Sequence, residues 1–545
     1  MRSVSEPGAG VGGRCTDVRD VPQGESPRWL RLTAPLAVVL VGGLLRLWHL
    51  GADDFWTDEV ATLHHASSFA TTYRDTHPPL YYLLTYAWLA VAPSSEFWLR
   101  LPSALMGTFG ILATYLLARS AFDRATGVVA AGFVALSTMH IWHAQDARMY
   151  ATLALLAAVS SWALLRACRA FTLSNAALYA VAATMLAYTH LFGLLTIAAH
   201  NAFVAYLLFA AGLPRRLVGR WIAVQAVVAA SVGPWLAFLA LNPGAERVDW
   251  IPPTGVRSVV DTFTQFSSDS TPLLAAYALL CLLGGLSYWL PMHWRPTPRQ
   301  RAVDPDDGQR SGPRPHQGGV EDDYAGPADS VRRGDGLYHD GASLAGERRV
   351  GLPLMLSLLL VPMVLAYLIS IVAIPLFVPR FLIAASIPLY VLAARGLVAI
   401  SPAPARYAAA AIVFALLLLG VREYMAMPHK PPWRNLVLAI APRVQANDVL
   451  VFDGHRPDVF DHYSERHGVL AQVPRVWLQA DRRSPAWSAE VVLSDALPDK
   501  RRFWLIQFGA DGGSRNVNEL ARRSYVATED ASVPGIRARL FMSRR

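Results

Sequence analysis

The amino-acid sequence predicts an all-α polytopic membrane domain of about 11 transmembrane helices, followed by a small C-terminal α/β domain. The first observation behind this is composition. Hydrophobic residues make up 53% of the 545 residues and charged residues only 16%, whereas soluble domains carry about 25% charged residues. The second is a series of apolar runs that approach the roughly 20 residues needed to cross a bilayer. The third is a return to globular composition after Pro428.

The chain is expected to begin with a disordered cytoplasmic segment, residues 1–28, which is rich in Gly and Ser. The first apolar run, Leu32–Leu50, follows Arg28 and Arg31. It is longer than the apolar part of a secretory signal peptide, and no small-residue cleavage site follows it. We therefore interpret this run as a retained membrane helix.

The membrane domain is predicted to span residues 29–426. Its spans are predicted near 32–50, 99–118, 126–143, 149–168, 174–191, 193–212, 219–241, 271–291, 352–373, 381–399 and 405–425.

A twelfth apolar run, His77–Pro93, decides the topology because it is shorter and is closed by prolines at both ends. If it crossed the bilayer, the arginine clusters downstream would lie outside, against the positive-inside bias. We therefore expect a juxtamembrane helix on the outer face, within an outer loop at 51–98. The same topology makes residues 295–350, rich in Pro, Gly, Asp and Arg, a disordered cytoplasmic loop.

Residues 428–545 are predicted to form a small α/β domain outside the cytoplasm. The apolar runs Asp448–Gly454 and Arg501–Gly509 are typical of buried strands, and Trp433–Gln445 has the periodicity of an amphipathic helix. A location outside the cytoplasm follows from the odd number of predicted spans.

Charge and cysteine content exclude several classes of function. The net charge of +9 comes nearly all from Arg, and in a polytopic protein such an excess belongs in cytoplasmic loops, so no nucleic-acid partner is expected. Cys15, Cys168 and Cys281 indicate no disulfide framework, and no CxxC or Cys/His metal spacing occurs.

The predicted topology collects polar residues from distant segments at one membrane surface. Charged groups at the ends of spans are costly unless they are solvated, paired or used. Taken singly, each has an ordinary interpretation as a snorkelling arginine, a structural histidine or a solvated acid. Together they are candidates for a site: Asp58, Glu59, His77, Arg100, Gln145, Asp146, Arg148, His190 and Arg380.

Carboxylates and arginines at a bilayer surface suit the transfer of a sugar from a polyprenyl phosphate. The leaving phosphate is a stable anion, so it needs positive charge to hold it, and Arg supplies a permanent bidentate charge. The acceptor hydroxyl needs a base, which a nearby carboxylate can provide. Hydrolytic glycosidases differ because they need a second carboxyl group to protonate a poor leaving group.

Five segments occur in order: "WTDEVATLHHA", "HPPLYYLL", "EFWLRLPSALMG", "AQDARMYA" and "VPRFLIAASIPLYVLAARG". In this order they resemble the bacterial polytopic glycosyltransferases of the GT-C class. The closest branch looks like the protein O-mannosyltransferases and the lipid A aminoarabinose transferases. The resemblance covers roughly residues 30–400. The segment 295–350 departs from the short loop of the family.

The resemblance implies an inverting enzyme of the bacterial inner membrane, active on its extracytoplasmic face, with a polyprenyl-phosphate-linked sugar as donor. The acceptor is a hydroxyl group of a lipid, a glycan or a protein. Asp58 matches the general base, and Glu59 an acceptor contact or supporting acid. Arg100 and Arg380 match residues that face the donor phosphate.

The resemblance gives less specific roles to the remaining candidates. Asp146 matches a position where many relatives carry Glu, and Arg148 is expected to pair with Asp146 or with the phosphate. His77, Gln145 and His190 are candidates for substrate binding.

Three alternatives stay open at this point. Asp58, Glu59, Asp146 and His190 could together hold a divalent cation, although no motif with metal-ligand spacing supports it. A transporter or lipid flippase would place its polar residues near the bilayer midplane, whereas these residues gather at one end of the spans. A scaffold protein would not need the clustered charges.

Overall fold

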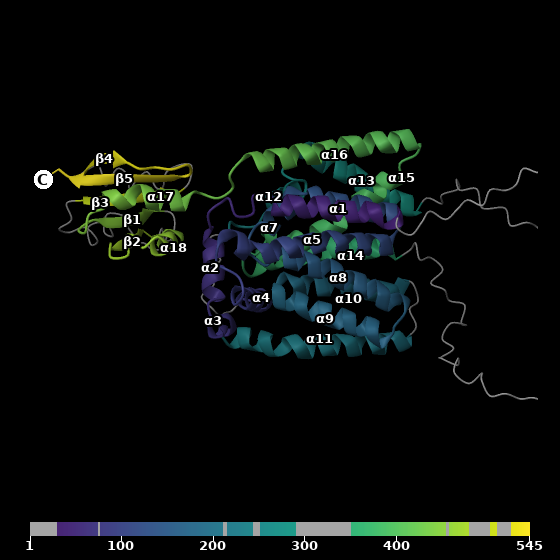
Figure 1. Cartoon of the computed structure of the whole chain (residues 1–545). Coiled ribbons are helices and arrows are strands. Elements are labelled where there is room, and N and C mark those ends of the chain that lie inside the picture. The colour runs from purple at the N-terminus through teal and green to yellow at the C-terminus, as the bar shows by residue number, and fades with distance from the viewer. Residues whose placement is uncertain are drawn as a thin grey trace, which may run out of the picture.

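The computed structural model describes residues 30–74, 77–210, 215–242, 251–289, 350–453, 457–478, 502–508 and 525–544. The predictions for residues 1–28 and for 295–349 lie outside this part of the chain. A long helical bundle forms most of the molecule, and a small domain with a sheet sits at one end of it (Figure 1).

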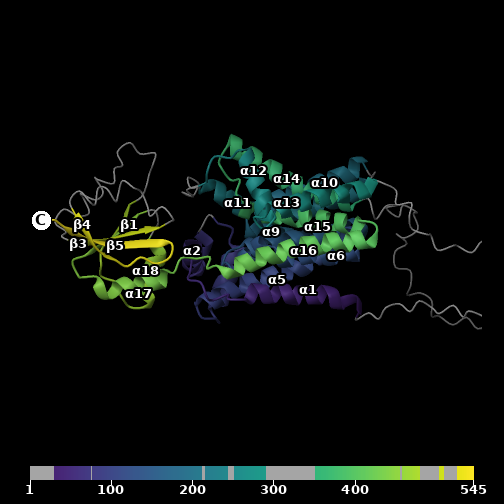
Figure 2. The same cartoon turned by 90° about the horizontal axis from the view of Figure 1, so that it is seen from above.

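The bundle consists of helices that run roughly along its long axis (Figures 1 and 2). In chain order they are α1 (Leu30–Leu47), α5 (Glu96–Ala121), α6 (Arg124–Leu136), α7 (Thr138–Ala144), α8 (Tyr150–Arg169), α9 (Leu173–Thr189), α10 (Phe192–Ala210), α11 (Arg215–Leu241), α13 (Thr271–Trp289), α14 (Gly351–Val372), α15 (Ile383–Ala399) and α16 (Ala403–Ala426). A short 3-10 helix, η1 (Pro379–Leu382), precedes α15.

Helices occur at all eleven predicted spans, but fewer than eleven reach the length of a full span. Within the described residues, 8 helices are long and apolar enough to cross a membrane, or 9 if the bent pair α6 and α7 is one span. The apolar part of α1, Thr33–Leu47, and the 17 residues of α9 are shorter. The prediction of a polytopic α-helical domain is thus confirmed, and its count of eleven exceeds what length and composition support.

The break between α6 and α7, a bend of 62°, is stabilised by a buried arginine. Arg46 of α1 donates hydrogen bonds to the carbonyl groups of Val134 (3.0 Å) and Ala135 (3.2 Å) at the end of α6. These carbonyl groups lose their partners in the helix where the chain turns. Ser137 begins α7 as its N-cap, accepting a hydrogen bond from the amide of His140. The bend therefore sets where the loop after α7 emerges.

Short helices gather at the end of the bundle that faces the small domain (Figure 1). They are α2 (Thr57–His65), α3 (Phe69–Arg74), α4 (Leu80–Leu89) and α12 (Val256–Phe266). The 10 residues of α4 extend about 15 Å, half of the roughly 30 Å of a hydrocarbon core. The run His77–Pro93 thus contains α4, which is too short to cross a bilayer, and its juxtamembrane position on the outer face stays a prediction.

The small C-terminal domain has a five-stranded sheet in the order β2-β1-β3-β5-β4. The strands β1, β2 and β3 are parallel, and β5 pairs antiparallel with β3 and with β4. The predicted strands and amphipathic helix are found here. Its elements are α17 (Trp433–Ile440), η2 (Ala441–Arg443), β1 (Val449–Asp453), α18 (Asp458–Arg466), β2 (Arg475–Leu478), β3 (Arg502–Phe508), β4 (Tyr525–Asp530) and β5 (Ile536–Ser543).

The core of this domain continues into the membrane domain. Phe55 and Leu99, from the end of the bundle, are fully buried in the same apolar cluster as Trp433 of α17. At the carboxyl end of β3, the ring of Phe508 lies 5.6 Å from that of Trp56. Because the two domains share one apolar core, the C-terminal domain is placed directly over the segment that carries Asp58.

Candidate active site

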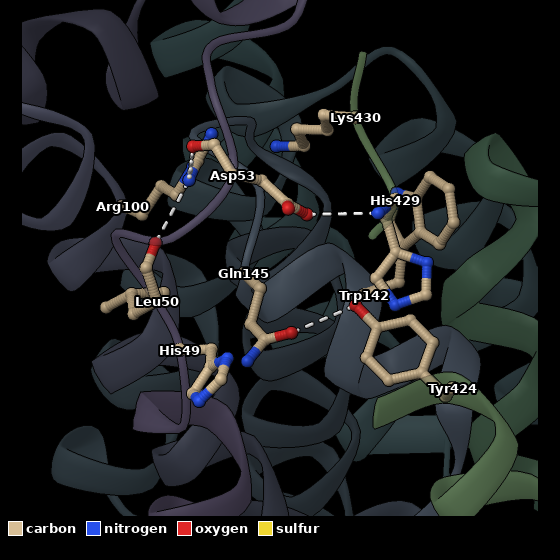
Figure 3. Close-up of a pocket in the computed structure, with 9 residues that line it drawn as sticks. All are labelled: His49, Leu50, Asp53, Arg100, Trp142, Gln145, Tyr424, His429 and Lys430. Atoms are coloured by element: carbon tan, nitrogen blue, oxygen red, sulfur yellow. Dashed lines mark hydrogen bonds between the residues drawn. The ribbon is translucent and has the colours of Figure 1, made fainter. Parts of the chain in front are cut away.

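Four segments meet at the end of the bundle beneath the C-terminal domain. They are the loop and helix at 53–65, the start of α5, the loop 145–149 between α7 and α8, and the linker 427–432 that leaves α16. Figure 3 shows part of this region, where Arg100, Asp53, Gln145 and Lys430 come together from all four segments.

Glu59 lies at the centre of this region and is fully buried. Its carboxylate accepts hydrogen bonds from Arg100 at 2.8 and 2.9 Å, and from the backbone amides of Ala147 and Trp56, each at 3.0 Å. Lys430 adds an ion pair at 2.8 Å. Burial alone would raise the pKa of Glu59, but Lys430 and Arg100 outweigh it and hold this pKa below its usual range. Glu59 is thus an ionised anchor with no oxygen turned to solvent.

Arg100 is also buried and directs its guanidinium group at protein atoms. Besides Glu59, it donates hydrogen bonds to the carbonyl groups of Leu50 (3.0 Å), Asp53 (2.8 Å) and Asp54 (2.9 Å). An arginine has five N–H donors, and these contacts use all three of its nitrogens. In this geometry the donors of Arg100 hold Glu59 and the loop before α2, and its predicted contact with the donor phosphate stays a prediction.

Asp146 is held by the linker to the C-terminal domain. The ammonium group of Lys430 lies 3.2 Å from Asp146 Oδ1. Burial raises the pKa of Asp146, Lys430 opposes this, and Glu59 and Asp58 add to it. Asp146 is therefore a buried carboxylate whose ionised form is favoured mainly by Lys430 and further by Arg148.

Asp58 is half-buried, and its carboxylate differs from those of its neighbours. Within the described part of the chain, no group donates a hydrogen bond to this carboxylate or forms an ion pair with it. Its charge interacts with Asp146, Arg148 and Tyr150. The backbone carbonyl of Asp58 is held by Thr62 Oγ1 at 3.0 Å. The position of Asp58 is thus fixed through its main chain, and its carboxylate stays available.

Arg148 lies buried next to Asp58. One of its terminal nitrogens donates to the hydroxyl of Tyr82 (3.2 Å) and reaches Thr62 Oγ1 at 3.5 Å. Its Nε has no hydrogen-bond partner in the described residues. The hydroxyl of Ser103 donates to the backbone carbonyl of Arg148 at 3.2 Å, which holds the loop. Arg148 therefore brings a positive charge with an unused donor close to the free carboxylate.

Arg380 and His190 lie around the same tyrosine ring. The guanidinium carbon of Arg380 is 6.0 Å from the ring centre of Tyr150, and the imidazole of His190 is 5.9 Å from it. Nδ1 of His190 accepts a hydrogen bond from the backbone amide of Phe192 (3.1 Å), so the neutral ring carries its proton on Nε2. Burial, with Arg148, His77 and Arg380, lowers the pKa of His190 to about 3. Burial is the largest cause of this shift, and the two arginines and His77 add to it.

Gln145 and His77, which are predicted to contact the substrate, both contact other protein groups in the structure. The amide nitrogen of Gln145 donates to backbone carbonyl groups at the end of α1, the shortest at 2.7 Å to Trp48, and its oxygen accepts from Tyr424 at 2.9 Å. Gln145 thus caps α1 and lines the pocket of Figure 3. The ring of His77 packs 5.5 Å from His65 and 6.0 Å from Tyr82.

The four residues considered as ligands of a divalent cation do not form a ligand set. In the described part of the chain, no group of three or more His, Cys, Asp or Glu is arranged to hold a metal ion. Glu59 and Asp146 instead receive their positive charge from Lys430 and Arg100.

Sequence reasoning placed most of this region but missed Lys430, Tyr82 and Tyr150. A signal for Lys430 was present, because only two of the 49 basic residues are lysines, Lys430 and Lys500.

The chain is similar to known proteins in sequence and in fold. Residues 76–238 match the family described as dolichyl-phosphate-mannose-protein mannosyltransferase. The crystal structure of apo ArnT from Cupriavidus metallidurans superimposes over 94% of this chain and 97% of that one, with a TM-score of 0.53 and 14% identity. The chain has the GT-C glycosyltransferase fold.

Two further structures share this GT-C fold. ArnT from the same organism bound to undecaprenyl phosphate has a TM-score of 0.52 at 14% identity and covers 95% of this chain and 98% of that one. The apo oligosaccharyltransferase of Archaeoglobus fulgidus has a TM-score of 0.51 at 13% identity and covers 94% of this chain and 74% of that one. Comparison with curated protein sequences finds no significant match.

Proposed function

We propose that the protein transfers a sugar from a polyprenyl-phosphate donor to an acceptor hydroxyl group, on the extracytoplasmic face of a bacterial inner membrane. The observation that carries this proposal is the contrast among three acids. Glu59 and Asp146 are tied to cations, while the carboxylate of Asp58 is unpaired within the described residues and lies beside Arg148. A base next to a cationic site for an anion is what this reaction requires.

In the proposed step, the acceptor oxygen attacks the anomeric carbon from the side opposite the phosphate. The bond between that carbon and the phosphate oxygen breaks, and its electron pair leaves with the polyprenyl phosphate. Asp58 takes the proton of the acceptor hydroxyl as the new glycosidic bond forms. The attack inverts the anomeric centre, and no acid is needed because the leaving group is already an anion.

Arg148 and Arg380 are the proposed phosphate ligands. Both interact with His190 and Tyr150, so they approach one region from different segments of the chain. Bidentate guanidinium groups suit the oxygens of a phosphate. His190 is proposed to offer its Nε2–H donor to the same phosphate, and His77 is proposed to contact the substrate beside Tyr82.

Glu59 and Asp146 enter the proposal in changed roles. Glu59 has no oxygen left for an acceptor, so we assign it to holding α2 against the loop 145–149 rather than to contact with substrate. Asp146 is proposed to shape the charge that Asp58 experiences. The acceptor is proposed to be a hydroxyl group of a lipid, a glycan or a protein.

The proposal is tested by comparing envelope glycans, glycolipids and glycoproteins by mass spectrometry in cells with and without the gene. Complementation with Asp58→Asn is expected to leave membrane levels of the protein unchanged and to abolish the modification. Asp261→Asn is the matched control, because Asp261 is an exposed acid on α12 whose one ion pair among the described residues is with Arg257 at 3.9 Å. Full modification with Asp58→Asn would remove Asp58 from the chemistry.

A further inference from the structure

We propose that Lys430 is a positioning residue of the active site, supplied by the linker to the C-terminal domain. Its ammonium group joins Glu59 on α2 to Asp146 on the loop between α7 and α8, and thereby sets the place and the charge environment of Asp58. The inference rests on the proposed function for what Asp58 does, but the ion bridge itself is a property of the structure.

The choice of residue type supports a specific role. Two of the 49 basic residues are lysines, so this chain uses arginine almost everywhere that a positive charge is needed. One of the two lies where two buried carboxylates meet. A lysine ammonium is a compact charge with three donors on a flexible stem, whereas a guanidinium is a wide planar fork. The narrow space between two acids favours the smaller group.

The two ion pairs of Lys430 form a buried bridge between the carboxylates of Glu59 and Asp146. Lys430 Nζ lies 2.8 Å from Glu59 Oε2 and 3.2 Å from Asp146 Oδ1, and its side chain is 8% exposed. Arg100 holds the other side of Glu59 at 2.8 Å. Removing one partner of a buried ionic cluster leaves an uncompensated charge. Without Lys430, Asp146 would keep no ion pair among the described residues.

The bridge is continuous with the contacts that dock the C-terminal domain. Next to Lys430, the amide of His429 donates to Asp53 Oδ2 at 3.1 Å. The amide of Arg434, at the start of α17, donates to Asp54 Oδ2 at 2.7 Å. The linker and α17 thus hold the chain before Asp58, at Asp53 and Asp54, and directly after it, at Glu59. The C-terminal domain therefore takes part in building the active site.

The same bridge controls the charge that faces Asp58. Burial favours the neutral form of Asp146, and Lys430 is the largest influence that opposes it. Titratable groups from every neighbouring segment interact with Asp146: Glu59, Asp58, Tyr81, Arg100, Arg148, Tyr150, Tyr424 and Lys430. Removal of Lys430 is expected to let Asp146 take up a proton at a higher pH, which changes the field at Asp58.

The first experiment compares Lys430→Met with Lys430→Arg in the full-length protein. In Lys430→Met, we expect kcat to fall on the order of 10²-fold, as for other small misplacements of a catalytic group, and the acidic limb of the pH–kcat profile to move to higher pH. Lys430→Arg keeps the charge, so its acidic limb should stay close to that of the wild type while kcat falls. Arg422→Met, at an exposed residue of α16, is the control and should change neither.

The second experiment measures thermal unfolding and does not depend on which reaction is catalysed. Lys430→Met should lower Tm, and adding Asp146→Asn should restore part of the loss, because an amide needs no counter-ion. Because the chain has two lysines, mass spectrometry can follow the acetylation of each one separately. Lys430 should be acetylated much more slowly in the folded than in the denatured protein.

The inference is overturned if Lys430→Met keeps the wild-type kcat and pH profile. Strictly additive losses of Tm in the double variant, or equal labelling of Lys430 in folded and denatured protein, would show that the bridge does not form. Failure of Asp58→Asn to abolish transfer would instead contradict the proposed function and would leave the melting and labelling results standing.

Discussion

The hydroxyl group of Tyr463 donates a hydrogen bond of 2.8 Å to Glu96 Oε1 across the boundary between the two domains. The same hydroxyl accepts a hydrogen bond from the amide of Phe55 at 2.7 Å. Tyr463 lies on α18, Glu96 begins α5, and Phe55 belongs to the loop before α2. Arg434 and Arg466 also contact Glu96, at 2.5 and 3.0 Å. A single phenol therefore connects the sheet domain, the bundle and the segment that carries Asp58.

The first prediction concerns this connection. Tyr463→Phe keeps the ring, but it leaves the buried amide of Phe55 without an acceptor and Glu96 with one donor fewer. We expect a loss of about 1–3 kcal/mol in the free energy of unfolding, with earlier tryptic cleavage after Arg434 at the start of α17. Thermal unfolding and limited trypsin digestion measure both effects. An unchanged Tm with unchanged digestion would show that the hydroxyl does not hold the domains together.

The second prediction compares two neighbouring glycines of α13. A Cβ at Gly284 would lie 2.6 Å from the carbonyl oxygen of Leu392 on α15, while a Cβ at Gly285 would meet nothing within 4 Å. Gly284→Ala should therefore push α13 and α15 apart and destabilise the bundle by about 1–3 kcal/mol. Gly285→Ala should be neutral or slightly stabilising, because alanine favours a helix more than glycine does.

Thermal unfolding of the two variants in the same detergent checks this comparison. The two substitutions are chemically identical and one residue apart, so any general effect of alanine in α13 cancels. Equal Tm values for both variants would contradict the close approach of α13 and α15.

The third prediction separates an arginine that holds the fold from one that binds phosphate. Arg100→Lys cannot replace contacts made by three nitrogens, so it should cost about 2–4 kcal/mol in the free energy of unfolding. Arg380→Lys should leave Tm nearly unchanged and weaken the binding of the polyprenyl-phosphate donor. Calorimetric unfolding and donor titration of both variants provide the measurement. Loss of donor binding at normal stability in Arg100→Lys would return Arg100 to the phosphate site.

The sequence predicted the membrane domain, the short helix α4 and the α/β character of the C-terminal domain. These features depend on hydrophobic runs, on arginine asymmetry and on strand patterns, which are local properties of the chain. The lengths of the individual spans were predicted less well. The break at Ser137 depends on Arg46 of another helix, whose guanidinium supplies hydrogen bonds at the end of α6. No pattern within α6 and α7 reveals this partner.

The contrast between local patterns and distant packing partners also explains which features of the site could be predicted. The sequence brought Asp58, Glu59, Asp146 and Arg148 to one surface, and the structure places them together. It could not show which acids are paired, because Glu59 and Asp58 are adjacent in sequence but have opposite environments: one is enclosed by Arg100 and Lys430, the other is half-buried and unpaired within the described residues. Rotation by one residue along α2 turns a side chain by about 100°, and only packing decides which acid faces the interior.

The last prediction uses His190 as a reporter of the phosphate site. Its pKa is about 3 because of burial and the nearby charges of Arg148, His77 and Arg380, so it is neutral in the free protein at pH 5. A phosphate anion held between Arg148 and Arg380 would offset their charge and raise this pKa. Binding of the donor should therefore take up protons, and its Kd should fall as the pH is lowered from about 6 to about 4.

The donor is a phosphodiester and keeps one negative charge across this range, so the titration does not arise from the ligand. Calorimetric titration at pH 5 in two buffers of different ionisation enthalpy measures the proton uptake directly. His190→Gln should bind the donor without that uptake, because the amide does not titrate. Donor binding with no proton uptake in the wild-type protein would place the phosphate away from His190, and the pair Arg148 and Arg380 would then not be its ligands.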